Sequence, residues 1–188
     1  YIEFEKDHHE HHHKETFITK YIFSQDHKMI AKQYLFTGVF FMGIIGILMS
    51  MLMRMQIAWP EQPNIIFDFI LGKWAPEGVM DADIYLALVT MHGTIMVFFV
   101  LTAGLSGTFS NLLIPLQLGA RDMASGFLNM LAYWLFFIST VLMVSSIFVE
   151  AGPAAAGWTI YPPLSALELA QPGSGLGMTL WLVSMAFF

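Results

Sequence analysis

The stretch QYLFTGVFFMGIIGILMSMLM, residues 33–53, decides the fold, because it runs for 21 residues without a formal charge. At about 1.5 Å per residue, a helix of this length spans roughly 31 Å, which matches the hydrocarbon core of a bilayer. Apolar blocks of similar length cover residues 84–107 and 127–149, and a further block, 178–188, runs to the last residue. The sequence therefore predicts an all-α integral membrane protein with three full transmembrane helices and the start of a fourth.

The composition supports this class and excludes others. Hydrophobic residues make up 56% of the chain and charged residues only 12%, well below the usual share in a soluble domain. Lone strands in lipid would leave backbone groups unpaired, so the spans must be helical. Basic clusters are missing, so we expect no nucleic acid partner. The chain has no cysteine, which excludes disulfides and thiolate metal sites within it.

The two ends of the chain suggest a fragment. The first residue is Tyr1 rather than methionine, and the final apolar block stops without a polar flank. We expect the natural N-terminus to lie upstream and the chain to be cut inside a membrane helix. Residues 1–32 are a polar tail rich in histidine and lysine. Its histidine run, 8–13, can bind a divalent metal, but it also fits a solvated tail or a tag remnant.

The positive charges predict the orientation. The tail carries five lysines, and the turn at 108–126 carries Arg121. The acidic loop 55–83 has only Lys73, and the Gly/Pro-rich loop 150–177 has no lysine or arginine. The positive-inside rule then puts the N-terminus and the 108–126 turn in the cytoplasm and both loops outside.

Small residues along the first two spans predict close approach of their backbones, as at many membrane helix interfaces. These residues are Gly38, Gly43, Gly46, Ala103, Gly104 and Gly107. The methionines between Met49 and Met55 are interpreted as packing residues rather than ligands.

His92 is the one histidine inside a predicted span, roughly 12 Å below the outer surface. An ionisable group at that depth is costly and indicates a functional site. Neutral imidazole is a good ligand for haem iron, and Gly93 leaves room for a flat cofactor. The alternative is a neutral histidine that hydrogen-bonds to a neighbouring helix, and the residues alone leave both interpretations open.

Asp122 lies at the inner end, just before the third span. Aspartate is a favoured helix N-cap, and its charge suits a helix N-terminus. The alternative is the mouth of a proton path, with Asn111 and Asn129 holding water nearby. Neither interpretation outweighs the other on the residues alone.

Three residues near the outer surface have two interpretations each. Arg54 suits an interfacial anchor, but it can also pair with a polar group of a cofactor. Trp158 and Tyr161 fit an aromatic belt, although their N–H and O–H groups can also hold a carboxylate such as a haem propionate.

Four linked motifs resemble one family. They are Met91-His-Gly-Thr-Ile-Met-Val-Phe-Phe99, Asn111-Leu-Leu-Ile-Pro-Leu-Gln-Leu-Gly-Ala-Arg-Asp122, Val149-Glu-Ala-Gly152 and Gly157-Trp-Thr-Ile-Tyr-Pro-Pro-Leu164. Their order and spacing resemble the N-terminal part of subunit I of the haem-copper oxidases, of the cytochrome c oxidase type. The resemblance covers roughly residues 26–188 and implies that 33–188 is part of a twelve-helix bundle.

The resemblance implies a role for each candidate residue. His92 matches an axial ligand of the low-spin haem, and Arg54 matches the arginine that hydrogen-bonds the formyl group of haem a. Asp122 matches the entrance of the proton D-channel, with Asn111 and Asn129 as its asparagines. In the outer loop, Trp158 and, less closely, Tyr161 match residues near the high-spin haem propionates. The high-spin haem a3 and CuB are expected from later helices.

The resemblance also bears on the electron donor. Quinol oxidases of this superfamily carry an arginine, an aspartate, a histidine and a glutamine at a quinol site. The aligned positions here hold Ile45, Met49, Ile84 and Ala87. This difference favours a cytochrome c type donor.

The resemblance implies a redox-driven proton pump that reduces dioxygen to water. Its partners would be a copper-bearing subunit II, subunit III and possible respiratory supercomplex members, in a bacterial plasma membrane or a mitochondrial inner membrane. The competing hypotheses are a quinol oxidase or nitric oxide reductase branch of the same superfamily, and a cofactor-free membrane transport or structural subunit.

Overall fold

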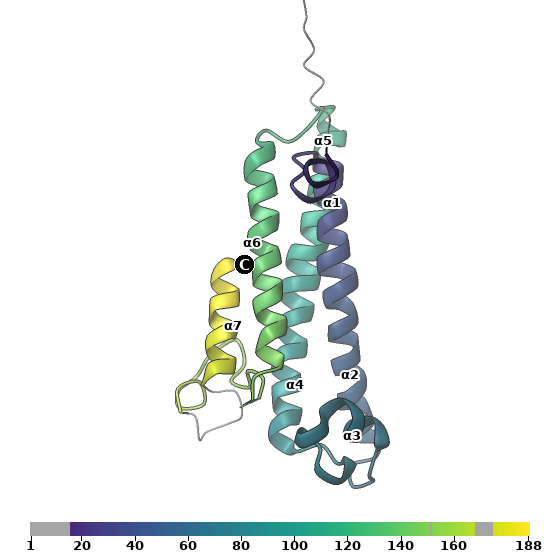
Figure 1. The fold of residues 1–188 in the computed structure, drawn as a ribbon, viewed down its shortest axis with the longest axis vertical. Coiled ribbons are helices and arrows are strands. Elements are labelled where there is room, and N and C mark those ends of the chain that lie inside the picture. The colour runs from purple at the N-terminus through teal and green to yellow at the C-terminus, as the bar shows by residue number, and fades with distance from the viewer. Residues whose placement is uncertain (1–15, 151, 168–174) are drawn as a thin grey trace, which may run out of the picture.

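The chain is a bundle of long helices standing side by side (Figure 1). The computed structural model describes residues 16–150, 152–167 and 175–188, and these contain helices and no strand. Three continuous helical runs, His27–Ala58, Ala82–Leu118 and Gly126–Ile147, are long and apolar enough to cross a membrane. The shorter apolar helix α7 (Leu176–Phe187) begins a fourth. The predicted all-α membrane fold is confirmed. The histidine run 8–13 lies outside the described residues.

The first run joins α1 (His27–Tyr34), the π-helical stretch η2 (Leu35–Met42) and α2 (Gly43–Ala58). It begins at His27, whereas the apolar pattern predicts a start at Gln33. The Asp26 side chain caps the helix by accepting a hydrogen bond from the Lys28 backbone N–H. A polar first turn is compatible with a membrane helix where it projects beyond the hydrocarbon core, so the uncharged stretch underestimates the helix.

The second run joins α4 (Ala82–Thr94), the π-helical stretch η5 (Ile95–Leu105) and α5 (Ser106–Leu118). We expected a turn from residue 108, but the helix continues to Leu118. Its polar side chains bond back to carbonyls one turn earlier, as Thr108 does to Gly104 at 2.6 Å. The helix ends only at Gly119, whose left-handed conformation (φ 66°) suits glycine.

Glycines bring the first two runs into backbone contact. A β-carbon on Gly38 would lie 2.5 Å from the Cα of Gly104, closer than real atoms approach. One on Gly107 would lie 2.7 Å from the Tyr34 ring, and one on Gly46 would lie 2.6 Å from the sulfur of Met96. The predicted close approach is confirmed at these positions, and it places α1, η2 and the start of α2 against α5 and η5. At Gly43 the prediction is wrong, because a β-carbon there would meet no atom within 4 Å.

The third run, α6 (Gly126–Ile147), packs against α7 (Figure 1). The buried hydroxyls of Ser139 and Ser184 lie 3.1 Å apart across this contact. The Trp181 indole N–H donates to the Thr94 hydroxyl at 3.2 Å, which ties α7 to α4. The start of the fourth span is therefore anchored close to His92.

The connection between the first two runs holds further short helices. They are α3 (Ile65–Leu71), η3 (Gly72–Trp74) and η4 (Pro76–Gly78). Asn64 caps α3 by accepting from the Ile66 N–H at 2.9 Å, and Phe67 is buried. This segment covers the lower ends of α2 and α4 in Figure 1. At the other end of the molecule, η1 (Ile18–Ile22) precedes α1.

Candidate functional site

His92 lies on α4 and faces α2. Its Nδ1 is 2.8 Å from the backbone carbonyl oxygen of Gly46. A carbonyl can only accept a hydrogen bond, so Nδ1 carries the proton in the neutral ring and Nε2 keeps its lone pair. Metal-binding histidines commonly use one nitrogen in this way to orient the other toward the metal. The contact also satisfies the alternative of a histidine bonded to a neighbouring helix, so it fits both interpretations.

The surroundings of His92 leave space for a flat group. A β-carbon on the adjacent Gly93 would meet no atom within 4 Å, and His92 itself is only partly buried. A histidine with one free lone pair, followed by a glycine with space around it, suits an axial ligand of haem. On these observations the residues present fit a haem, with His92 Nε2 as the ligand atom.

Arg54 lies on α2, eight residues beyond Gly46 in the sequence, a rise of about 12 Å. It is exposed, and no carboxylate pairs with it among the described residues. The guanidinium is therefore available to the polar edge of a cofactor or to the membrane interface. Both interpretations from the sequence remain compatible with its place.

Trp158 and Tyr161 lie in the loop between α6 and α7 and are 50% and 67% exposed. The Trp158 ring meets the edge of Phe98 on η5, with 5.6 Å between ring centroids. The Thr90 hydroxyl, on the helix that carries His92, donates to the Ala155 carbonyl at 3.2 Å. This bond holds the loop against α4, so the two aromatic residues belong to the same side of the molecule as the outer end of the His92 helix.

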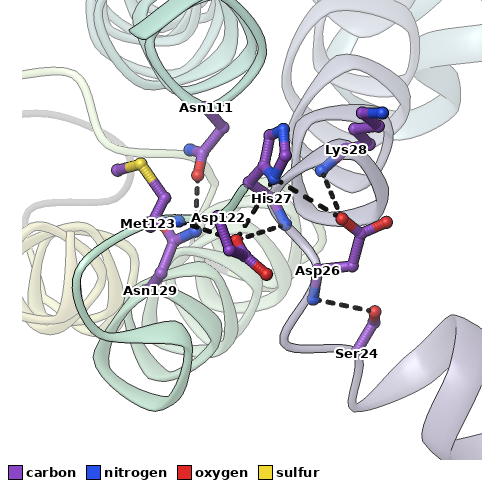
Figure 2. Close-up of polar contacts among 8 residues, drawn as sticks. All are labelled: Ser24, Asp26, His27, Lys28, Asn111, Asp122, Met123 and Asn129. Carbon is purple, nitrogen blue, oxygen red and sulfur yellow. Dashed lines mark hydrogen bonds and ion pairs between the residues drawn. The ribbon is translucent and has the colours of Figure 1, made fainter. Parts of the chain in front are cut away.

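A second polar site lies at the opposite end of the bundle (Figure 2). The Asn129 side-chain amide on α6 donates to the Asn111 side-chain oxygen on α5 at 2.5 Å. Asn111 also donates to the Gly107 carbonyl at 2.7 Å and is only 4% exposed. The structure thus brings together the two asparagines that the sequence analysis paired.

Asp122 lies in the short connection between α5 and α6. It does not cap α6, because the cap is Ser125, whose hydroxyl accepts from the Leu128 N–H. The N-cap interpretation of Asp122 is therefore wrong. Its carboxylate instead accepts hydrogen bonds from the backbone N–H groups of Met123 at 2.7 Å and His27 at 3.2 Å.

His27 is the site residue that sequence reasoning missed. Its ring is 2% exposed, and Nδ1 lies 3.2 Å from Asp122 Oδ1 and 3.5 Å from Asp26 Oδ1 (Figure 2). Its Nε2 is buried and has no hydrogen-bond partner. We predicted that this histidine belongs to a polar tail, because residues 1–32 are rich in polar side chains. The signal was Asp26, a favoured N-cap residue that stands seven positions before the apolar block and starts the helix at His27.

The side chains at this end of the molecule can therefore bind and release protons. The Asp122 carboxylate is 44% exposed and touches a buried imidazole, and the adjoining helices carry the asparagine pair, in which Asn111 is buried and Asn129 is half-buried. Carboxylate and imidazole exchange protons readily, whereas amides orient water without titrating. By contrast, the His92 end has an imidazole whose Nδ1–H is held by a backbone carbonyl, which leaves the lone pair of Nε2 free.

Comparison with known proteins decides the family. The family described as cytochrome C and quinol oxidase polypeptide I matches residues 29–188. The chain belongs to this family. It is thus a haem-copper oxidase subunit I sequence and part of a multi-pass membrane protein. Membership in this family implies haem and copper cofactors.

Curated relatives agree with this membership. The alternative cytochrome c oxidase subunit 1 of Bradyrhizobium diazoefficiens is 42% identical over 94% of this chain and 27% of that protein. The cytochrome c oxidase subunit 1 of Cereibacter sphaeroides is 34% identical, over 84% of this chain and 30% of its own. A heme-copper oxidase subunit I+III of Aeropyrum pernix is 36% identical, over 87% and 18%. The chain thus spans less than a third of each relative.

Proposed function

We propose that this chain is the N-terminal part of the catalytic subunit of a terminal respiratory oxidase. In this proposal electrons pass from cytochrome c through a low-spin haem a to a haem a3–CuB centre on later helices. There dioxygen is reduced to water and protons are pumped. Family membership supports the oxidase class, and it favours the ligand role of His92, whose Nδ1 contact with the Gly46 carbonyl at 2.8 Å leaves Nε2 free.

In the proposal, His92 holds the low-spin haem through Nε2, and Arg54 bonds its formyl group. The bound haem supplies one-electron redox chemistry without exchange of ligands. The Gly46 carbonyl fixes the ring tautomer, which leaves Nε2 free to act as the ligand atom. Trp158 and Tyr161 would donate hydrogen bonds to propionates from the outer loop.

At the other end, we propose that Asp122 takes up protons from the cytoplasmic water. Its partial exposure supports this role, since a carboxylate must contact both solvent and the interior. His27 Nδ1 lies 3.2 Å from the carboxylate and holds it in place, and Asn111 and Asn129 orient water beyond it. This assignment uses the orientation predicted from the lysines, with the N-terminus in the cytoplasm of a bacterium.

The nature of the outer cavity favours a cytochrome c type donor over quinol. Three of the positions aligned with a quinol site, Ile45, Met49 and Ile84, line a cavity of about 290 Å³. The other lining side chains are also apolar or aromatic, and the fourth aligned residue, Ala87, is fully buried. A quinol headgroup needs hydrogen-bond partners for its two oxygens, and this wall supplies no such side chain apart from the Trp74 indole.

The first experiment is a reduced-minus-oxidised optical spectrum of the complete oxidase, with extraction of its haems. We expect haem a in a low-spin form with two histidine ligands. A spectrum with only b-type haem would remove the formyl partner of Arg54 and favour another branch of the superfamily, such as a nitric oxide reductase. A colourless protein would support a cofactor-free transport or structural subunit and contradict the proposal.

A further inference from the structure

Two unpaired polar atoms flank one cavity near the start of the first run. The cavity has a volume of about 340 Å³ and is lined by residues of α1, η2, α6 and the preceding segment. Gln33 Oε1 and Trp134 Nε1 both belong to residues of its wall, and both are buried without a hydrogen-bond partner. Unpaired buried polar atoms are unfavourable. A group that brings one donor and one acceptor into this cavity would satisfy both atoms.

The orientation of Gln33 is fixed by its own contacts. Its Nε2 donates to the carbonyls of Tyr21 at 2.8 Å and Ile22 at 2.9 Å, so Oε1 is the acceptor that points elsewhere. We call residues 18–23 the strap, because these bonds hold the segment across α1. The ring of Phe23 stacks on Trp134 with 4.9 Å between centroids. The strap therefore lies against both residues, and a ligand in the cavity reaches their buried unpaired atoms only if the strap shifts outward.

The cavity continues into an apolar one. The second, also of about 340 Å³, shares Phe36, Thr37 and Tyr133 with the first. Its remaining wall is formed by Phe41, Phe137, Thr140 and Val141. Both helices run away from the end that carries the strap (Figure 1), so these higher-numbered residues lie deeper. The two cavities therefore form one groove, polar near the end of the bundle and apolar toward its middle.

Charge and surface composition indicate what fits this groove. Lys32 lines its polar end, and no carboxylate pairs with it among residues 16–150, 152–167 and 175–188. The strap exposes Ile18, Tyr21 and Phe23 next to Lys20. Exposed aromatic and aliphatic side chains beside lysine are typical of segments that lie among lipid headgroups. Lysines at this level attract anionic lipids.

We propose that this groove binds an anionic phospholipid whose headgroup carries hydroxyls, as phosphatidylglycerol does. Its phosphate accepts hydrogen bonds from Trp134 Nε1 and Lys32, and a headgroup hydroxyl donates to Gln33 Oε1. One acyl chain lies along the apolar part of the groove, against Phe41 and Phe137. This binding site does not depend on the haem or proton assignments, since it shares no residue with either.

Native mass spectrometry of the complete oxidase tests the proposal. The protein is exchanged into detergent with equal amounts of phosphatidylglycerol, phosphatidylethanolamine and phosphatidylcholine. We expect the wild type to retain phosphatidylglycerol preferentially. Trp134→Phe keeps the stacked ring but removes the donor, and should lower retention about tenfold. Lys32→Gln should reduce the preference for the anionic lipid. Lys28→Gln, one turn earlier on the same helix and outside the cavity wall, is the matched control and should bind as wild type.

Four results would overturn the proposal. Equal retention by wild type and Trp134→Phe would show lipid that is not held by this groove, as would equal retention of the three lipids. Wild-type protein without retained lipid would show that another part of the oxidase fills the groove. Displacement of the lipid by inorganic phosphate alone would show a simple phosphate site. The optical spectrum is recorded on every variant as a control for folding. The substituted residues are not part of the proposed haem site, so an unchanged spectrum indicates that the variant is folded.

Discussion

The His92 end and the Asp122 end of this bundle hold their functional groups in different ways. His92 is oriented by one backbone carbonyl across two helices that glycines bring together. Asp122 is held by side-chain and backbone contacts from segments distant in sequence, including His27 at the start of the first run. The first arrangement leaves a single lone pair free, as a metal ligand requires. The second offers groups that exchange protons with water, as a proton entrance requires.

The largest expected effect comes from removing the lone pair. His92→Ala in the complete oxidase should abolish the low-spin haem signal, because no other described histidine lies in a membrane span at that level. The measurement is the reduced-minus-oxidised spectrum. His27→Ala is the matched control at the other end and should keep the signal. If both variants kept it, the ligand assignment would be wrong.

Removing the charge at the proton end should slow turnover without changing the haem. Asp122→Asn keeps the size of the side chain but cannot take up a proton, so we expect oxygen consumption to fall about tenfold or more. Proton pumping, followed by a pH indicator in vesicles, should weaken. Asp68→Asn changes an acidic residue of α3, in the connection at the other end, and should leave both rates unchanged. Normal proton pumping by the Asp122→Asn variant would contradict the assignment of Asp122 to the proton entrance.

The glycine contact between the first two runs should stabilise the bundle that holds His92. Gly38→Ala forces a β-carbon against the Gly104 backbone, and such overpacking typically costs about 1–3 kcal/mol of stability. Gly43→Ala, the same substitution on the same helical run, meets no atom within 4 Å and should be tolerated. Thermal loss of the low-spin band measures both. Equal melting temperatures would show that the close contact does not support the site.

The smallest expected effect concerns Arg54. Arg54→Gln removes the proposed formyl donor, so the low-spin absorption band should shift while oxygen consumption remains within about a fewfold of wild type. Lys73→Gln, another outer cation, bonds the Glu150 carbonyl and should leave the band in place. An unshifted band in Arg54→Gln would support the interfacial anchor instead.

Hydropathy predicts the class of fold because uncharged stretches must match the bilayer, and small residues predict which helices touch. Hydropathy does not predict the residues at which the helices begin and end. Asp26 extends the first run to His27, and back-bonded polar side chains such as Thr108 extend the second to Leu118. The positions of charged residues indicate where the hydrocarbon core of the bilayer ends. Capping and side-chain hydrogen bonds decide where a helix ends.

The candidate sites likewise contain residues that the sequence predicted and contacts that it could not predict. The sequence identified His92 and the asparagine pair because polar residues near or inside apolar stretches are conspicuous. It did not predict the partner of His92, since the Gly46 carbonyl is a backbone group with no residue-specific signal. It missed His27 because that contact joins residues 95 positions apart in the chain. Only the folded helices bring such groups together.

The most direct test of the two-ended account is a rapid-mixing experiment on the Asp122→Asn oxidase, which follows haem reduction and proton uptake together. The account predicts that the low-spin haem is reduced at the wild-type rate while proton uptake is slowed. Equal slowing of both, or a wild-type rate for both, would contradict the assignment of electron entry to the His92 end and proton entry to the Asp122 end.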